Sequence, residues 1–211
     1  MALQPFTRFD GLAAALWREN VDTDVIIPSR EITGPGREGY GAKAFTPWRY
    51  LQPGGAENPE FVLNQAPWRQ ATILVAGANF GCGSSREMAV WALAQFGFRV
   101  LIAPSFGAIF RSNCVRNGLL AIELPAGVVQ GLAEQAARAP LVLAVDLQHR
   151  RIERPGATPI DFAIDDSDRE MLLSGLDAID RTWQLRAAIE AFERGDRALR
   201  PWVYLDRDGS G

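Results

Sequence analysis

The sequence predicts an α/β fold with a partly parallel central sheet flanked by helices. Three short apolar runs in the middle of the chain support this prediction, namely residues 72–76, 99–103 and 119–124. Each run is followed by a segment in which apolar residues recur every three or four positions, as they do along a helix. Because strands that alternate with helices of ten to fifteen residues form parallel sheets, we expect the three runs to lie side by side.

Start and stop signals define the helices between these strands. The first is expected over residues 87–96 and is stopped by Gly97. The second opens at Pro104 and Ser105 and ends at Asn117, and the third begins at Pro125. Proline at a helix start and glycine or asparagine at its end are typical of such boundaries.

The flanking regions follow a different pattern. A β-meander, a short capped helix and a last amphipathic helix are expected after the parallel part, at residues 141–147, 151–154, 159–164, 165–173 and 185–193. On the N-terminal side, residues 6–16 and 25–28 should supply further strands. The stretch 31–41 is rich in glycine and proline, and we expect a loop that is mobile without a partner.

Composition limits the classes of function. We expect one domain over residues 1–194, followed by a charged tail over 195–211. The net charge of −3 gives no basic face for nucleic acid. No apolar run approaches the roughly 20 residues needed to cross a bilayer. The first residues lack the layout of a signal peptide, and two cysteines do not suggest a secreted disulfide scaffold, so a cytoplasmic protein is expected.

Residues 77–87 form the most informative segment. They place Ser84, Ser85 and Arg86 after a loop punctuated by glycines, between the strand at 72–76 and the helix at 87–96. The first amides of a helix lack internal partners and carry the positive end of its dipole, which makes such a junction an anion site. A guanidinium fork adds a binding group for carboxylate or phosphate.

The same residues have a purely structural interpretation. Ser84 at the N-cap with Glu87 three positions later matches a capping box, which requires no function. A cap alone, however, does not require three preceding glycines, a second serine and an arginine. A nucleotide-binding module is a further alternative, but the glycine spacing matches neither the dinucleotide nor the P-loop pattern.

Residues 79–87 resemble the signature of the swivelling domain of the aconitase superfamily and, more narrowly, the small subunits of bacterial 3-isopropylmalate dehydratase. The resemblance extends over most of the chain through residues 20–28, 41–51, 103–110, 113–120 and 175–182. It implies an aconitase-like swivelling β/β/α domain. It also implies a hydro-lyase subunit that acts with a large subunit to interconvert 2-isopropylmalate and 3-isopropylmalate in leucine biosynthesis.

The resemblance assigns roles to individual residues. Ser84 is expected to be the catalytic base, and Ser85 and Arg86 to bind a carboxylate of the small hydroxy diacid substrate. Asp24 should lie near them and hold an arginine or order the serine loop, with Asp22 and Gly83 in support.

The family's four-iron four-sulfur cluster uses three protein cysteines, whereas this chain has only Cys82 and Cys114. The cluster is therefore expected on the large subunit, with no metal on this chain. We expect Cys114 to be part of the core and Cys82 to lie near the site. His149, the single histidine, is expected in a solvated turn.

Three departures from the family pattern leave alternatives open. Met88 stands where the family usually has histidine, and residues 29–37 are unlike the usual run there. The tail from Arg194 to Gly211 is also longer and more charged than expected. A dehydratase for another hydroxy diacid, such as citramalate or dimethylmalate, or an inactive paralogue, therefore remains in consideration. Arg37 and Arg49 are weaker candidates for contact with substrate or partner.

Overall fold

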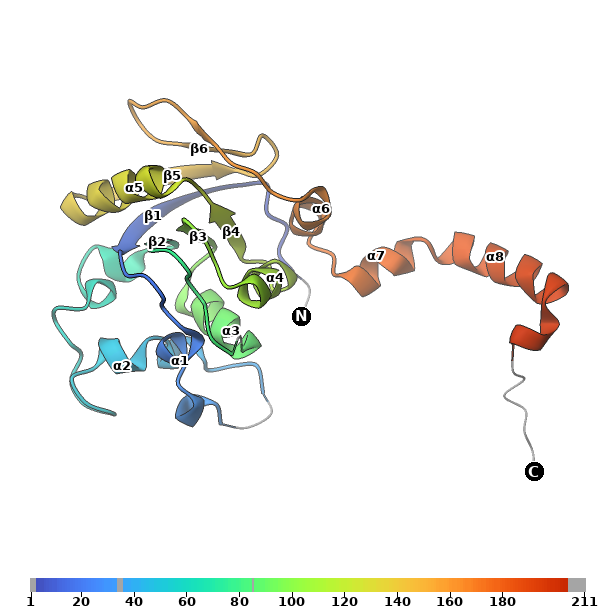
Figure 1. The fold of residues 1–211 in the computed structure, drawn as a ribbon, viewed down its shortest axis with the longest axis horizontal. Coiled ribbons are helices and arrows are strands. Elements are labelled where there is room, and N and C mark those ends of the chain that lie inside the picture. Colours follow the sequence, from blue (N-terminus) through green and yellow to red (C-terminus); the bar gives the residue numbers. More distant parts are fainter. Residues whose placement is uncertain (1–2, 34–35, 85, 205–211) are drawn as a thin grey trace.

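The structure is a computed structural model that describes residues 3–33, 36–84 and 86–204. Within these ranges, seven strands form one sheet in the order β4-β3-β2-β1-β5-β6-β7 (Figure 1). The strands are β1 (Arg8–Leu16), β2 (Ile73–Ala76), β3 (Val100–Ala103), β4 (Leu120–Glu123), β5 (Leu141–Asp146), β6 (Arg151–Glu153) and β7 (Ile160–Asp161). Strands β1 to β4 are parallel, and β5, β6 and β7 continue the sheet from β1 in antiparallel pairs. The predicted partly parallel sheet is confirmed.

Both faces of the parallel half are covered. All four residues of β2 and all four of β3 are buried, as expected for strands read from continuous apolar runs. The helices α3 (Glu87–Phe96), α4 (Ala108–Arg116) and α5 (Ala126–Arg138) follow β2, β3 and β4 in turn. The three predicted helices are thus present, although α4 begins four residues after Pro104.

Neighbouring strand residues serve two hydrophobic clusters on opposite faces of the sheet. Leu74 and Leu101 belong to one cluster, together with side chains from α1, α3 and α4. Ile73 and Val100, each one position earlier, belong to the other cluster beneath α5. This alternation follows from the two-residue period of a strand.

Short helical segments replace one predicted strand. Residues 25–28 were expected to be extended, but Thr23–Ile26 form the helical turn α1, and Asp22 caps it by accepting a hydrogen bond from the Val25 amide at 2.8 Å. A further turn, α2 (Thr46–Arg49), and 3-10 turns at Ser29–Glu31, Gly41–Lys43, Val62–Asn64 and Trp68–Gln70 complete this region. The expected mobility of residues 31–41, of which 34 and 35 lie outside the described ranges, stays a prediction.

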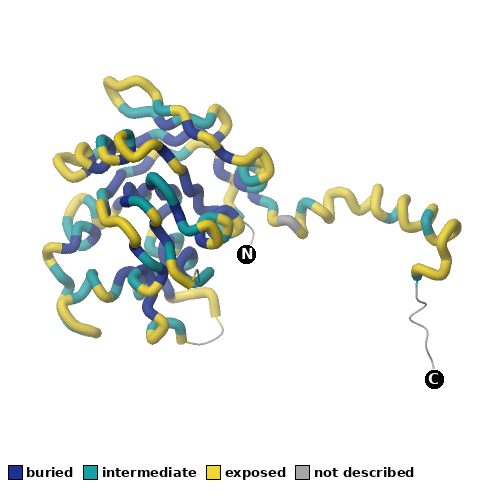
Figure 2. The backbone as a smooth tube through the Cα atoms, in the orientation of Figure 1, coloured by how far each residue is buried: buried dark blue, intermediate teal, exposed yellow. Residues whose placement is uncertain are grey.

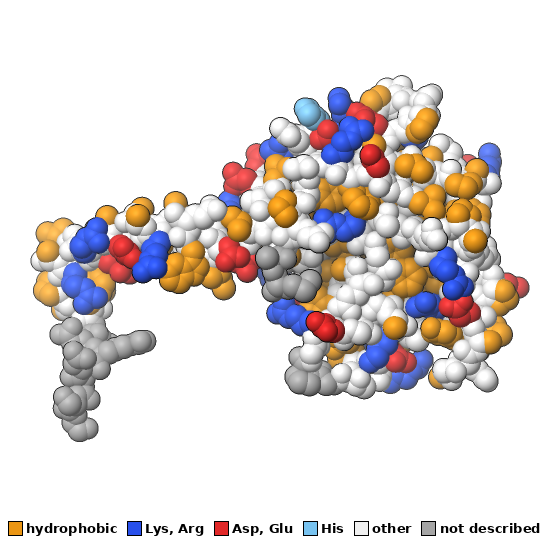
Figure 3. Space-filling view, turned by 180° about the vertical axis from the view of Figure 1, so that it is seen from behind, with side chains coloured by type: hydrophobic (Ala, Val, Ile, Leu, Met, Phe, Trp, Pro, Cys, Tyr) orange, Lys and Arg blue, Asp and Glu red, His pale blue; other side chains and the backbone are white. Residues whose placement is uncertain are grey.

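The C-terminal part leaves the body of the molecule. After α6 (Asp166–Ser174), the helices α7 (Ala178–Gln184) and α8 (Arg186–Leu199) and the 3-10 turn Pro201–Val203 extend outward (Figure 1). This segment is exposed along its length and carries hydrophobic side chains (Figures 2 and 3). The predicted helix over 185–193 overlaps α8, which begins one residue later and extends to Leu199, whereas α7 was not predicted. The boundary placed at residue 194 falls inside α8 and stays a prediction.

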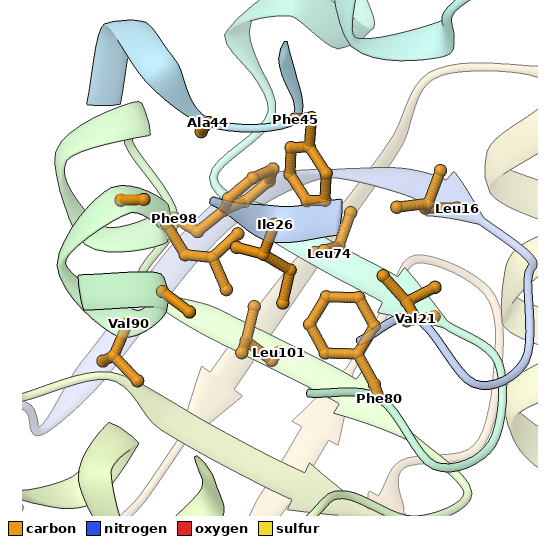
Figure 4. Close-up of a cluster of buried hydrophobic side chains, with 14 of the residues drawn as sticks. Leu16, Val21, Ile26, Ala44, Phe45, Leu74, Phe80, Val90, Phe98 and Leu101 are labelled. Atoms are coloured by element: carbon orange, nitrogen blue, oxygen red, sulfur yellow. The ribbon is translucent and has the colours of Figure 1, made fainter. Parts of the chain in front are cut away.

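The hydrophobic cluster that includes residues of α3 lies next to the loop that follows β2 and carries Ser84, which is called the serine segment here. Phe45, Phe80 and Phe98 are fully buried in this cluster (Figure 4). Phe80 stands at the beginning of the serine segment and packs edge-to-face on Phe110, with ring centroids 5.8 Å apart. This packing anchors the loop that carries Ser84 to the core.

Candidate active site

Three loops meet at one edge of the sheet. Because β1, β2 and β3 run parallel, their carboxyl ends at Leu16, Ala76 and Ala103 lie on the same edge. In open α/β sheets this edge is where ligands bind. The predicted serine segment, residues 77–86, is the middle loop of the three.

Backbone hydrogen bonds tie the middle loop to both neighbours. The Gly81 amide donates to the Val21 carbonyl at 2.7 Å, and the Thr23 amide donates to the Cys82 carbonyl at 3.0 Å. On the other side, the Gly107 amide donates to the Phe80 carbonyl at 2.9 Å. Bridges at Asp22–Cys82 and Phe80–Phe106 continue the parallel pairing beyond the strands. The loop that presents Ser84 is therefore held in place on both sides.

Gly81 is the position at which this loop most clearly requires glycine. Its φ is +72°, in the left-handed region, and a Cβ built there would lie 2.2 Å from the Phe110 ring. Gly156 has nearly the same φ, +69°, but a Cβ there would meet nothing within 4 Å. Comparing substitutions at the two glycines therefore separates the energetic cost of backbone strain from that of a steric clash.

We expect Gly81→Ala to destabilise the fold by about 2–5 kcal/mol, because strain and overpacking add. The matched variant Gly156→Ala should cost about 1 kcal/mol, from strain alone. Denaturant unfolding of both variants measures the difference. Equal losses in the two variants would show that the contact with Phe110 does not constrain the loop.

The helix that follows the loop starts later than the capping-box hypothesis requires. Helix α3 begins at Glu87, and Arg86, with extended backbone, is its N-cap without a side-chain hydrogen bond. Glu87 instead accepts a hydrogen bond from the Asn117 side chain at 3.0 Å. The capping box was therefore wrong, because Arg86, which pairs with Asp24, occupies the N-cap position in place of Ser84. Ser84 is exposed, and Ser85 lies outside the described residues.

Arg86 and Asp24 form an ion pair at this helix start. Arg86 Nη1 donates to Asp24 Oδ1 at 2.6 Å, and Nη2 lies 3.5 Å from Oδ2. The Ser29 hydroxyl donates to the same carboxylate at 3.1 Å. The hydrogen bond from Arg86 lowers the pKa of Asp24 below its usual value. The expected meeting of Asp24 with an arginine is thus observed between residues 62 positions apart.

Asp22 and Gly83 occupy the contact between the first two loops. The Asp22 carboxylate caps α1, and a Cβ on Gly83 would lie 3.4 Å from that of Asp22. Gly83 itself has a φ of +88°. The two residues shape the backbone that leads to Ser84, and their supporting role stays a prediction.

Comparison with known proteins identifies the family. The family model described as "Aconitase C-terminal domain" matches residues 3–127. The 3-isopropylmalate dehydratase small subunit of Cupriavidus necator is 49% identical and covers 97% of this chain and 100% of its own length. The protein of the same name from Rhodospirillum rubrum is 47% identical over 96% of this chain and 98% of its own.

The chain belongs to the family of 3-isopropylmalate dehydratase small subunits. A crystal structure of 3-isopropylmalate dehydratase from Methanocaldococcus jannaschii is similar to it in fold. That structure superposes with a TM-score of 0.62 at 25% identity and covers 88% of this chain and 99% of its own. The aconitase-like fold expected from the sequence is confirmed.

Met88, which stands where the family usually has histidine, packs against the hydrophobic core. Its side chain is half-buried and packs against the same cluster as Phe80. A thioether is a flexible, apolar filler at such a position. In this chain the residue after Glu87 therefore serves packing of α3.

The two cysteines do not form a cluster site with other ligands. Cys114 is buried in the core as expected, and burial raises the pKa of its thiol well above the usual value. Burial, with the charge of Asp22, also raises the pKa of Cys82. In the described ranges no group of three or more His, Cys, Asp or Glu residues is placed to hold a metal ion. Two cysteines alone supply fewer thiolates than an iron–sulfur cluster uses, so these residues do not fit such a cluster.

The remaining candidates lie outside the serine loop. Arg49 is largely buried, and its guanidinium lies 5.1 Å from the centroid of the Phe96 ring. The same guanidinium pairs with the Glu57 carboxylate at 3.8 Å. Arg37 stacks over Trp91 at 5.0 Å. His149 lies in the expected turn and hydrogen-bonds Asp146 at 2.8 Å. These contacts give all three residues structural roles.

Two asparagines that the sequence analysis did not single out support the site. Asn79, at a φ of +57°, donates from its side chain to that of Asn20 at 2.7 Å. The backbone amide of Asn79 donates to the Ser105 hydroxyl at 2.9 Å. A signal for Asn79 was available, since asparagine is enriched in left-handed backbone. Its partners, Asn20 and Ser105, lie on two other loops, and no local pattern in the sequence predicts that they meet Asn79.

Proposed function

We propose that this chain is the small subunit of a 3-isopropylmalate dehydratase. The enzyme is a hydro-lyase that interconverts 2-isopropylmalate and 3-isopropylmalate by dehydration and rehydration in leucine biosynthesis, together with a large subunit. The observation that supports the proposal most strongly is the exposed Ser84 two positions before a guanidinium held by Asp24. Close identity over nearly the full length of the small subunits supports the same substrate rather than citramalate or dimethylmalate.

Ser84 takes the substrate proton in this proposal. Dehydration next to a carboxylate requires removal of a proton from a weakly acidic carbon, and a serine hydroxyl is a poor base unless its alkoxide is stabilised. Positive charge from Arg86 and the dipole at the start of α3, two and three positions after Ser84 in the sequence, support this role because both favour an oxyanion. The proton passes from the substrate carbon to the Ser84 oxygen, where it exchanges with solvent, and the Ser84 hydroxyl delivers a proton to the neighbouring carbon during rehydration.

Arg86 binds a substrate carboxylate, and Asp24 positions Arg86. A guanidinium carries five N–H donors in a planar fork. Asp24 faces only Nη1 and Nη2, so the fork can be fixed by one carboxylate and still receive a second. Ser85 is proposed as a further hydrogen-bonding group for the substrate.

The four-iron four-sulfur cluster is proposed to lie on the large subunit. When bound there, it supplies a Lewis acid for the departing hydroxyl. We also assign the group that protonates this hydroxyl to the large subunit, and we propose a cytoplasmic heterodimer. Within the described residues every helix is too short or too polar to span a bilayer.

Reconstitution with the large subunit tests the function. The complex should interconvert 2-isopropylmalate and 3-isopropylmalate, and each subunit alone should not. Citramalate and dimethylmalate serve as competing substrates in the same assay. A complex that dehydrates either of them with the higher kcat/KM would contradict the proposed substrate, and an assembled complex without activity on all four would support the inactive paralogue.

We expect the isolated chain to remain colourless. After anaerobic incubation with iron and sulfide, its absorption spectrum should lack cluster bands, because Cys82 and Cys114 are fewer than the three cysteines that the family's cluster uses. The large subunit treated in parallel should acquire them. A stoichiometric cluster on the isolated chain would contradict the assignment of the cluster to the partner.

A further inference from the structure

The C-terminal arm, defined here as residues 178–204, is a large feature that the active site does not use. It extends away from the sheet (Figure 1), and no residue of α8 is buried. Figure 3 shows hydrophobic side chains along it. The large exposed ones are Ile179, Trp183, Leu185, Ile189, Phe192, Leu199, Trp202 and Val203. Apolar side chains gathered in this way mark an interaction surface.

The apolar side chains follow the geometry of one helix face. Leu185, Ile189, Phe192 and Leu199 recur along α8 at positions that share a side of a helix. Ile179 and Trp183 are one turn apart on α7. Ile179, Trp183 and Ile189, with Arg186, line a hollow of about 610 Å³ at the junction of the two helices. The arm thus presents a continuous apolar face with a recess.

The charges of the arm are balanced in number, and four of the charged residues pair within it. Residues 178–204 contain five arginines and four acidic residues. Arg186 pairs with Glu190 at 2.7 Å, and Arg200 pairs with Asp196 at 2.6 Å. Helices that bind membrane surfaces carry an excess of cations on the polar face. Balanced charge instead favours a protein partner that contacts the apolar face.

We infer that the apolar face of the arm docks in an apolar groove of the large subunit; this rests on the proposed function. The alignments with the relatives from Cupriavidus necator and Rhodospirillum rubrum cover 97% and 96% of this chain, so they extend into the arm. Both relatives are named small subunits. A feature shared by these two small subunits fits a large-subunit partner, which both names imply. An amphipathic helix in a groove is an established mode of recognition.

A second copy of this chain is a poorer occupant. Asp196 lies on the apolar face, between Phe192 and Leu199 in the helical repeat. In a parallel pair of α8 helices, the two ion pairs of Asp196 with Arg200 would meet. In an antiparallel pair centred on Phe192, Asp196 would oppose Ala188. Both arrangements place this ion pair in the interface without a new polar partner, whereas the groove of a different chain can provide a polar group at this point.

Phe192→Asp in the full-length chain tests the inference. Phe192 is 66% exposed, so the substitution leaves the core intact. We expect the Kd for the purified large subunit, measured by titration calorimetry, to rise at least about 30-fold, as for loss of an interface hot spot. The kcat at saturating large subunit should stay within about twofold, because the arm makes no contact with substrate.

Ala187→Asp is the matched control, since it places the same side chain on the opposite, exposed side of α8. Its Kd should stay within about threefold of the parent. An unchanged Kd for Phe192→Asp, or equal losses for both variants, would overturn the inference. So would a homodimer of the isolated chain, or binding to phosphatidylserine vesicles, that Phe192→Asp abolishes.

Ser84→Ala separates this inference from the proposed function. That variant should bind the large subunit with the parental Kd but lose turnover, the reverse of Phe192→Asp. If Phe192→Asp weakens binding in a complex that proves inactive on isopropylmalates, the docking surface stands and the proposed function fails.

Discussion

Replacing Ser84 with alanine is expected to lower kcat of the reconstituted enzyme by about 10²–10⁴-fold, the usual effect of losing a general base. KM should change little, because Arg86 and not Ser84 makes the main contact with the substrate carboxylate. Steady-state kinetics with 3-isopropylmalate measure both constants.

The fold provides a sharp control for this variant. Ser84 is exposed and does not cap α3, whose N-cap is Arg86. The free energy of unfolding should therefore change by no more than about 0.5 kcal/mol, as for an ordinary surface position. A kcat within tenfold of the parent in a stable, fully assembled complex would show that Ser84 is not the base.

Arg86→Lys is expected to reduce kcat/KM by about 10²-fold or more, although the positive charge remains. Lysine offers a point charge and cannot make two parallel hydrogen bonds to a carboxylate. It also loses the contact of both Nη atoms with Asp24, so the substrate is held less accurately against Ser84. An unchanged kcat/KM for the lysine variant would mean that the substrate carboxylate binds elsewhere.

Asp24→Asn is the matched control for this pair. Its amide keeps the shape of the carboxylate but not the charge, and we expect a smaller loss of kcat/KM than for Arg86→Lys, because the guanidinium remains. In the parent, Arg86 lowers the pKa of Asp24. The pair's contribution to stability is therefore present above the unfolded pKa of about 3.9 and is lost as the pH falls through the lower folded value.

The strands and the glycine loop could be predicted from the sequence because their signals are local. The continuous apolar runs of β2 and β3 indicate burial on both faces, and Gly97 stops α3 where predicted. Helix α3 begins at Glu87 as predicted, whereas the capping box was wrong because Arg86, which pairs with the distant Asp24, is the N-cap. Residues 25–28 were misassigned for the opposite reason: the local cap by Asp22 outweighs β propensity there.

The residues of the candidate site differ in how far the sequence alone predicts their roles. Ser84 and Arg86 follow from the strand–loop–helix pattern, whereas the role of Asp24 came only through the family resemblance. The parallel order of β1, β2 and β3 brings together three polar side chains, those of Asn20, Asn79 and Ser105. A single sequence does not give the order of strands in a sheet. An amphipathic helix was expected near residue 185, but not that it would leave the body of the fold.

Deuterium incorporation tests the central claim, that Ser84 of this chain exchanges a proton with the substrate carbon. The reconstituted parent enzyme in deuterium oxide should introduce deuterium at the carbon protonated during rehydration, and proton NMR follows the loss of that signal. The Ser84→Ala complex, assembled to the same extent, should show almost no incorporation over the same period. Incorporation by Ser84→Ala at the parental rate would contradict the account, because another group would then be the base.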